Sequence, residues 1–95
     1  MKKYIVILKD SSGEAPEKAL IIRHVDHLKR LDAKGLLYIC GPLKGNGEAL
    51  QIIFAETMEE ASLLVNEDPF IQEGFYRQFS ISELIEANEA NNYLL

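Results

Sequence analysis

The sequence predicts an α+β domain in which an antiparallel sheet of four strands is covered on one face by two helices. Four segments have the length and apolar content of strands, and two have the three- and four-residue apolar spacing of helices. Their order is strand, helix, strand, strand, helix, strand. A chain of 95 residues has room for one core, so residues 1–95 are expected to form a single domain.

The first half of the domain is expected to be a strand followed by a long helix. Residues 4–8 are a continuous apolar run, which the polar, turn-forming segment 10–13 ends. The helix is expected to begin near Pro16. The N–H groups of a first helical turn have no partner within the helix, so a proline, which has no N–H, is well suited to this position. The helix ends at about Lys34, before Gly35. Its expected apolar positions are Leu20, Ile21, Val25, Leu28 and Leu31.

The middle of the chain is expected to hold two adjacent strands. Residues 36–40 form an apolar run that ends at Gly41-Pro42. Residues 44–47, with the sequence Lys-Gly-Asn-Gly, are typical of a turn between antiparallel strands. The next strand is expected over residues 50–55.

The last third of the chain is expected to supply a second helix and a fourth strand. Thr57 followed by Glu60 is a capping box, which predicts a helix over residues 58–65. Asp68-Pro69 predicts one short further turn, and the alternating polarity of residues 76–81 predicts a strand with one wetter face. This order favours the ferredoxin-like arrangement, with a core of about residues 2–84 and a polar tail, 85–95, without a clear role.

The apolar strands predict that the sheet is covered on both faces. The first three strands are apolar at nearly every position, yet two helices on one side cover only one face. Burying even a few hundred Å² of the other face is worth several kcal/mol at ~25 cal/mol per Å². We therefore expect a homodimer in which the open sheet faces of two copies pack together.

Composition narrows the possible partners. The formal net charge of −5 argues against binding to nucleic acid or to an anionic membrane. No apolar run is long enough to span a bilayer, and the short apolar start of the chain is interpreted as a strand, not a signal peptide. The single cysteine, Cys40, excludes an internal disulfide. We therefore expect a cytoplasmic protein.

The first helix contains the best candidate for acid/base chemistry, because an imidazole exchanges a proton near neutral pH. His24 shares a helical stripe with Leu20, His27 and Leu31, at the edge of the apolar face. Taken alone, it is most simply a half-buried histidine, and His27 is expected on the surface. A metal site would need a third ligand, and no residue with that spacing follows. We expect neither a metal nor a cofactor.

Two further positions have both a structural and a functional interpretation. Asp68 before Pro69 is most simply a helix cap, but a carboxylate can also orient a distant histidine. Gly41-Pro42 ends a strand, and a glycine there also lets backbone approach a ligand. Cys40 is expected to be a small core residue. Tyr38 and Tyr76 can hydrogen-bond a substrate, although in strands they more often contribute to packing.

Together these segments resemble the YciI-like (YCII-related) family of small bacterial proteins. The resemblance spans roughly residues 3–81. It is carried by His24–Leu31, by Gly35–Pro42, and by Glu59-Glu60-Ala61 leading to Asp68-Pro69-Phe70 and Gly74. It implies the dimeric α+β barrel form of the ferredoxin-like fold. It also implies a pocket in which a helix-borne histidine faces the aspartate of the Asp-Pro-aromatic motif, here His24 and Asp68.

The resemblance implies a binding site more firmly than a reaction. Relatives with this fold include muconolactone isomerase-like enzymes, and one YCII-containing protein is a dehydrochlorinase of a chlorinated hydroxyquinol. The residues expected to bind substrate are Arg23, Gly41, Pro42, Pro69 and Phe70. Many members carry an arginine three residues before the histidine, where this chain has Ile21. The arginine of this chain is Arg23, and adjacent helical residues point about 100° apart.

Our leading hypothesis is a cofactor-independent homodimer in which Asp68 orients His24 as a general acid or base. The substrate is expected to be a small organic molecule, and the reaction an isomerisation or an elimination. One alternative is a non-catalytic module that binds a metabolite or a partner protein in the same pocket. A purely structural dimer is the third possibility.

Overall fold

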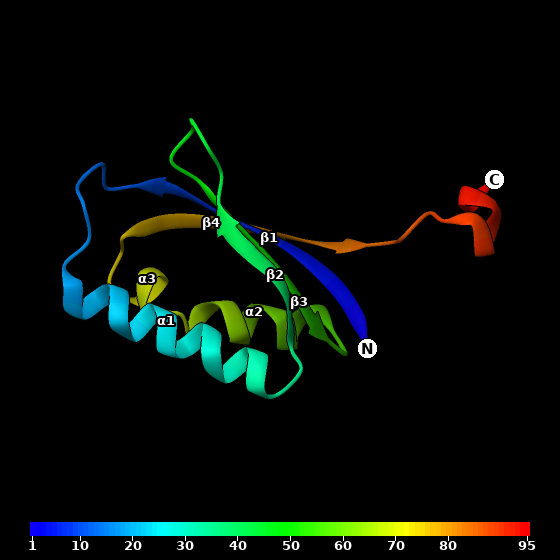
Figure 1. Ribbon diagram of the computed structural model, residues 1–95, viewed down its shortest axis with the longest axis horizontal. Helices are drawn as coiled ribbons and strands as arrows, with labels where there is room; N and C mark the ends of the chain where they lie inside the picture. The colour runs from blue at the N-terminus through cyan, green and yellow to red at the C-terminus, as the bar shows by residue number, and fades with distance from the viewer.

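The predicted order of elements is confirmed by the computed structural model, which describes residues 1–95 (Figure 1). The short turn expected at Asp68-Pro69 is the helix α3, and a C-terminal 3-10 helix is an addition that was not predicted. In chain order the elements are β1 (Lys2–Ser11), α1 (Lys18–Ala33), β2 (Leu37–Pro42), β3 (Ala49–Ala55), α2 (Met58–Asn66), α3 (Pro69–Gln72), β4 (Tyr76–Leu84) and η1 (Glu89–Leu94).

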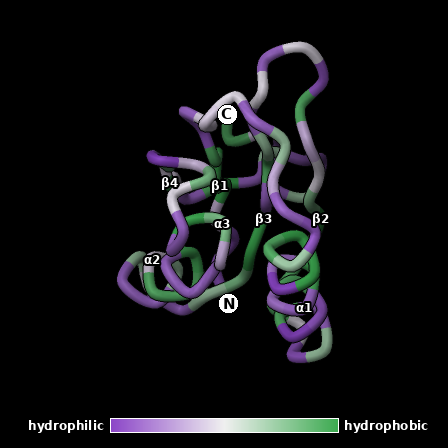
Figure 2. Tube along the Cα trace, turned by 90° about the vertical axis from the view of Figure 1, so that its left-hand side faces the viewer, coloured by the Kyte–Doolittle hydropathy of each residue, from purple (hydrophilic) through white to green (hydrophobic).

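The four strands form one antiparallel sheet in the order β2-β3-β1-β4. The central strand β1 pairs with β3 on one side and with β4 on the other, so that Val6 lies opposite Gln51 and Ile81. All three helices α1–α3 lie on one face of this sheet (Figures 1 and 2). This is the predicted ferredoxin-like α+β fold. No helix of the chain combines the length and apolar character needed to cross a bilayer.

The core lies between the sheet and the helices. Side chains alternate across a strand, so Tyr4, Val6 and Leu8 of β1 all face the helices and are buried. On β3 the same parity buries Ile53 and Ala55. Ala61, Val65 and Leu31 complete the contact from α2 and α1.

The helix ends follow the predicted sequence signals. Gly35 has a φ of +72°, which glycine adopts without strain, and the Leu36 N–H donates to the Leu31 carbonyl at 2.9 Å. The Thr57 hydroxyl accepts the Glu60 N–H at 3.1 Å. The Glu60 carboxylate accepts the N–H of Glu56, not that of Thr57, so the reciprocal half of the capping box forms one residue earlier than predicted.

The face that α1 turns toward the sheet differs from the predicted one. Leu31 and His27 are its buried residues, whereas Ile21 and Val25 are exposed. The expected surface position of His27 was therefore wrong. The helix packs through the stripe on which Leu20, His24, His27 and Leu31 follow each other, and this rotation places Ile21 on the outside.

The other face of the sheet carries apolar side chains without a covering helix. Ile5 and Ile7 of β1 lie beside Ile52 and Leu50 of β3 in register, and Ile39 of the edge strand β2 lies opposite Ile52. Ile39 is 53% exposed. We call this surface the open face; its apolar members are Ile5, Ile7, Ile39, Leu50, Ile52 and Phe54.

Candidate active site

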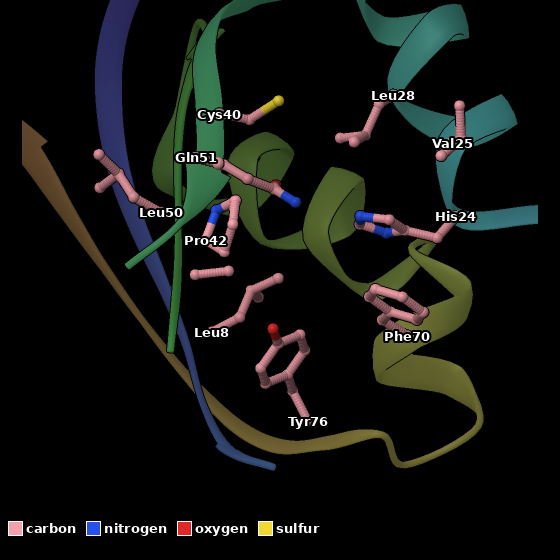
Figure 3. A pocket seen from close by; sticks show the side chains of 12 residues that line it. Leu8, His24, Val25, Leu28, Cys40, Pro42, Leu50, Gln51, Phe70 and Tyr76 are labelled. Carbon is pink, nitrogen blue, oxygen red and sulfur yellow. The ribbon is translucent and has the colours of Figure 1, made fainter. Parts of the chain in front are cut away.

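A cavity of about 330 Å³ lies between α1, α3 and the neighbouring ends of the four strands (Figure 3). It falls within the range of volumes typical of small-molecule sites. Most of its wall is apolar, supplied by Leu8, Val25, Leu28, Pro42, Ala49, Leu50 and Phe70. The polar side chains in the wall are those of His24, Gln51 and Tyr76.

His24 and Asp68, separated by 44 positions in the sequence, meet beside this cavity. His24 Nδ1 lies 2.8 Å from Asp68 Oδ1. The Asp68 side chain is completely buried, and that of His24 is 15% exposed. The pair therefore has one solvent-shielded carboxylate and one imidazole with access to the cavity.

Asp68 is held in place by its position at the start of α3. Its Oδ1 accepts the Phe70 N–H at 2.9 Å, which is the side-chain cap expected of an aspartate before Pro69. Its Oδ2 accepts from Gln51 Nε2 on β3 at 3.2 Å. Asp68 thus caps α3 and contacts His24 at the same time, so the two interpretations of this residue do not exclude each other.

The hydrogen bonds of Asp68 determine how His24 is presented. Both carboxylate oxygens already accept N–H groups, so we assign the proton of the contact with His24 to Nδ1, which then donates to Asp68. In the neutral imidazole, Nε2 then carries the free lone pair. The ring is stacked on Phe70, with centroids 3.9 Å apart and planes 11° apart, and it points into the cavity (Figure 3). Both contacts restrict its orientation.

Gln51 is a site residue that the sequence reasoning missed. It is 2% exposed on β3 and connects the sheet to Asp68. With Nε2 donating to Asp68, its Oε1 can accept a hydrogen bond. The signal was present in the sequence: Gln51 is the one polar residue in the strand Ala49–Ala55.

Tyr76 was expected to pack in its strand, and it also lines the cavity. The ring is 8% exposed, and the hydroxyl points toward the hollow in front of His24 (Figure 3). Burial, followed by the negative charge of Asp68, raises the pKa of the Tyr76 phenol. The hydroxyl therefore keeps its proton at neutral pH and is able to donate a hydrogen bond.

The end of β2 forms the opposite wall of the cavity. Gly41 and Pro42 lie there, as expected from the strand end. Cys40 is exposed at this edge strand, so its expected place in the core was wrong. Partial burial, followed by the negative charge of Asp32, raises the pKa of the Cys40 thiol. This shift disfavours the thiolate that a nucleophilic cysteine needs.

Two of the residues expected to bind substrate lie outside the cavity. Arg23 is exposed and its Nη2 contacts Glu73 Oε1 at 3.3 Å, because a residue adjacent to His24 points to a different side of α1. Pro69 is buried in the first turn of α3, next to the wall that Phe70 provides. No lysine or arginine lines the cavity, so it offers no cationic side chain to an anionic ligand.

His27, one turn after His24, is buried and takes no part in the cavity wall. It is 3% exposed, and its Nε2 has no hydrogen-bond partner. Burial lowers the pKa of His27, an effect that the negative charge of Asp68 partly opposes. The chain brings together no group of three or more histidine, cysteine or acidic side chains with the arrangement of a metal site.

The comparison with protein families tests the family resemblance found in the sequence. The YCII-related domain matches residues 1–85. The chain belongs to the YCII-related family. The match includes His24, Asp68 and every strand of the sheet. No protein with a curated description matches this member of the family.

The fold of this YCII-related protein is also found among solved structures. It is similar to 5-chloro-2-hydroxyhydroquinone dehydrochlorinase from Burkholderia phenoliruptrix AC1100, solved in complex with 2,5-dihydroxybenzoquinone. The TM-score is 0.68 and the sequence identity 20%, over 93% of this chain and 97% of that chain. At this identity the likeness supports the shared fold.

Proposed function

We propose that this YCII-related protein is an enzyme in which His24 transfers a proton to and from a small, uncharged organic molecule. The observation that carries the proposal is the 2.8 Å contact between His24 and the fully buried Asp68 at the wall of a largely apolar cavity. A buried carboxylate that fixes one imidazole nitrogen leaves the other available as a base.

The proposed reaction begins at a carbon next to a carbonyl group. His24 Nε2 removes a proton from this carbon, and the electron pair of the C–H bond forms a carbon–carbon double bond as the carbonyl oxygen gains negative charge. In an isomerisation, the imidazolium returns the proton to another carbon of the same molecule. In an elimination, the carbonyl group re-forms and the electron pair of the enolate makes a double bond to the next carbon, from which a leaving group such as chloride departs with its bonding electrons. The imidazolium then releases its proton to water, which regenerates the base. Asp68 stabilises the imidazolium formed in between.

The cavity favours a particular class of substrate. Its volume of about 330 Å³ suits a molecule of one or two rings, and Phe70, stacked on His24, adds an apolar edge to the wall beside the imidazole. The protonated Tyr76 hydroxyl is able to donate a hydrogen bond to the carbonyl oxygen. The lack of a lysine or arginine in the wall favours an uncharged molecule. Elimination is also the reaction named for the structurally similar dehydrochlorinase.

The proposed functional unit is a homodimer formed through the open face. Six apolar side chains on this face lack a covering element: Ile5, Ile7, Ile39, Leu50, Ile52 and Phe54. A second copy offers the same apolar surface in a two-fold arrangement. The cavity, on the helix side of the sheet, stays accessible in such a dimer.

Two probe reactions test the chemistry. A cyclic β,γ-unsaturated ketone reports isomerisation through its conjugated product, and a cyclic β-chloro ketone reports elimination through released chloride. We expect the protein to accelerate one of them, and His24→Ala to slow it by about 10² to 10⁴-fold, the usual contribution of a positioned base. Deuterium uptake from heavy water into the recovered ketone shows proton removal even where turnover is slow.

Ile22→Ala is the matched control and is expected to keep the wild-type rate, because Ile22 is an exposed residue of α1 that does not line the cavity. Equal rates for the wild type and His24→Ala would contradict the proposal. A ketone that binds in the cavity yet is recovered unchanged and without deuterium would favour the alternative, a non-catalytic binding module.

A further inference from the structure

The end of the chain forms an arm that leaves the domain. Residues 85–95, the C-terminal arm, continue from the end of β4 and project away from the helices (Figure 1). Its 3-10 helix η1 packs against no other element of the chain. The family match stops at residue 85, so the arm is an addition to the YCII-related domain.

The arm has a defined structure in spite of this isolation. The Asn88 side chain accepts the Asn91 N–H at 3.1 Å, and the Asn91 side chain accepts the Asn88 N–H at 3.0 Å. Asn91 Nδ2 also donates to the Glu86 carbonyl at 2.8 Å. An ion pair between Glu86 and Lys3 fastens the base of the arm to β1. Residues 88–95 make their hydrogen bonds only within the arm.

The tip of the arm is apolar and exposed. Tyr93 is 59% exposed, Leu94 55% and Leu95 99%. Exposure of three successive large apolar side chains to water is energetically unfavourable. Burying each of them against another surface is worth roughly 1.5–3 kcal/mol.

The backbone of the tip also requires support. Asn92, Tyr93 and Leu94 have φ values of 52°, 54° and 68°, so three successive residues other than glycine are left-handed. Each such residue costs roughly 1–2 kcal/mol, and conformations of this kind persist where surrounding contacts hold them. No other helix or strand of this chain contacts η1, so any support beyond the arm's own hydrogen bonds has to come from elsewhere.

We propose that the C-terminal arm packs against a second copy of this chain, and that each copy receives the arm of the other. The inference rests on the open-face dimer described above. The arm continues β4 beyond the end of the sheet and ends on the side away from the helices, so it is free to reach a second copy that packs on the open face (Figures 1 and 2). A two-fold dimer makes the exchange reciprocal, so two apolar tips are buried at once. The arm then stabilises the dimer through contacts that the YCII-related domain itself does not make.

Photo-crosslinking tests where the tip lies. A photoreactive phenylalanine analogue replaces Tyr93, and ¹⁵N-labelled chain carrying it is mixed with unlabelled wild-type chain before irradiation. The control places the same analogue at Ile22, which is 51% exposed on the outer side of α1. Mass spectrometry distinguishes crosslinks within one chain from those between two. A second measurement compares dimer dissociation of the full chain and of a chain that ends after Glu86.

We expect the Tyr93 position to give crosslinks between labelled and unlabelled chains, and the Ile22 position to give none. Truncation after Glu86 is expected to raise the dimer dissociation constant at least about tenfold, because two apolar tips lose their contacts. The truncated chain keeps His24 and Asp68, so the probe reactions can be measured on it independently.

Two results would overturn the proposal. One is a full-length chain that stays monomeric, which would also remove the open-face dimer. The other is a stable dimer whose Tyr93 crosslinks lie within single chains and whose dissociation constant is unchanged by truncation. In that second case the open-face dimer and the chemistry proposed for His24 would both stand without the arm.

Discussion

The Asp68 carboxylate forms hydrogen bonds with three other residues. It caps α3 through the Phe70 N–H, accepts from Gln51 on β3 and orients His24 on α1. Three elements therefore converge on one buried group, and the direction of the imidazole depends on the packing of all three. A helix cap is a suitable place for such a residue, because the rigid first turn fixes the carboxylate before it meets the histidine.

Tyr76 gives a prediction at this same scale. Removing only its hydroxyl, in Tyr76→Phe, keeps the ring that packs on Phe70 and Phe75. If the hydroxyl donates to the substrate oxygen, the variant loses about 0.5–1.5 kcal/mol of binding, or roughly two- to tenfold in affinity. Calorimetric titration of the cyclic ketone probes measures this. Equal affinity for wild type and variant would leave Tyr76 as a packing residue.

At the scale of elements, the strands and helix ends were predictable because each follows from local chemistry. The apolar run of β1, Gly35 after α1 and Thr57 before α2 each determine the structure within a few residues of their own position. The rotation of α1 was not predictable in the same way. Ile21 and Val25 are as apolar as Leu31, so only tertiary packing decides that His27 is buried and they are not.

The residues of the candidate site likewise differ in whether local sequence signals or only tertiary packing determine their positions. His24 and Asp68 were predicted as a pair, since both carry chemistry and lie in recognisable segments. The local pattern singles out Gln51 as the one polar residue of β3, but it does not identify Asp68, 17 positions away, as its hydrogen-bond partner. Arg23 was misplaced because its direction follows from the rotation of α1.

The burial of His27 in α1 predicts a dependence of stability on pH. Burial lowers its folded-state pKa from the ordinary 6.5, so below about that pH the unfolded chain binds a proton that the folded chain does not. Stability therefore falls as the pH drops through 6.5 toward the lowered value. His27→Leu removes both this proton site and the unpaired Nε2, and is expected to lose less stability on acidification.

Urea unfolding of both chains between about pH 8 and pH 5 measures this difference. Above pH 6.5 the curves of wild type and His27→Leu are expected to run parallel, and below it to diverge. Parallel curves over the whole range would contradict this prediction, because they would mean that folding does not change the pKa of His27.

At the scale of the whole molecule, the open face is an apolar surface that no element of the chain covers. Ile7 lies near its centre, between Leu50 and Ser80 on the neighbouring strands. A charge there is tolerated in water but not between two packed sheets. Ile7→Asp is expected to convert the proposed dimer into a folded monomer, as measured by light scattering coupled to size exclusion.

Ile22→Asp is the matched control, because Ile22 is an exposed isoleucine on the outer side of α1. It is expected to leave the dimer intact. Dissociation by the Ile22 change, or a dimer that survives Ile7→Asp, would place the contact between copies on another surface.

The tautomer of His24 is the measurement that tests the central claim most directly. Long-range ¹H–¹⁵N correlation spectra, recorded where the imidazole is neutral, distinguish a proton on Nδ1 from one on Nε2. We predict that the proton lies on Nδ1 in the wild type and that the preference is lost in Asp68→Ala, which removes the acceptor. A wild-type ring protonated on Nε2 would contradict the account, because no lone pair would then face the cavity.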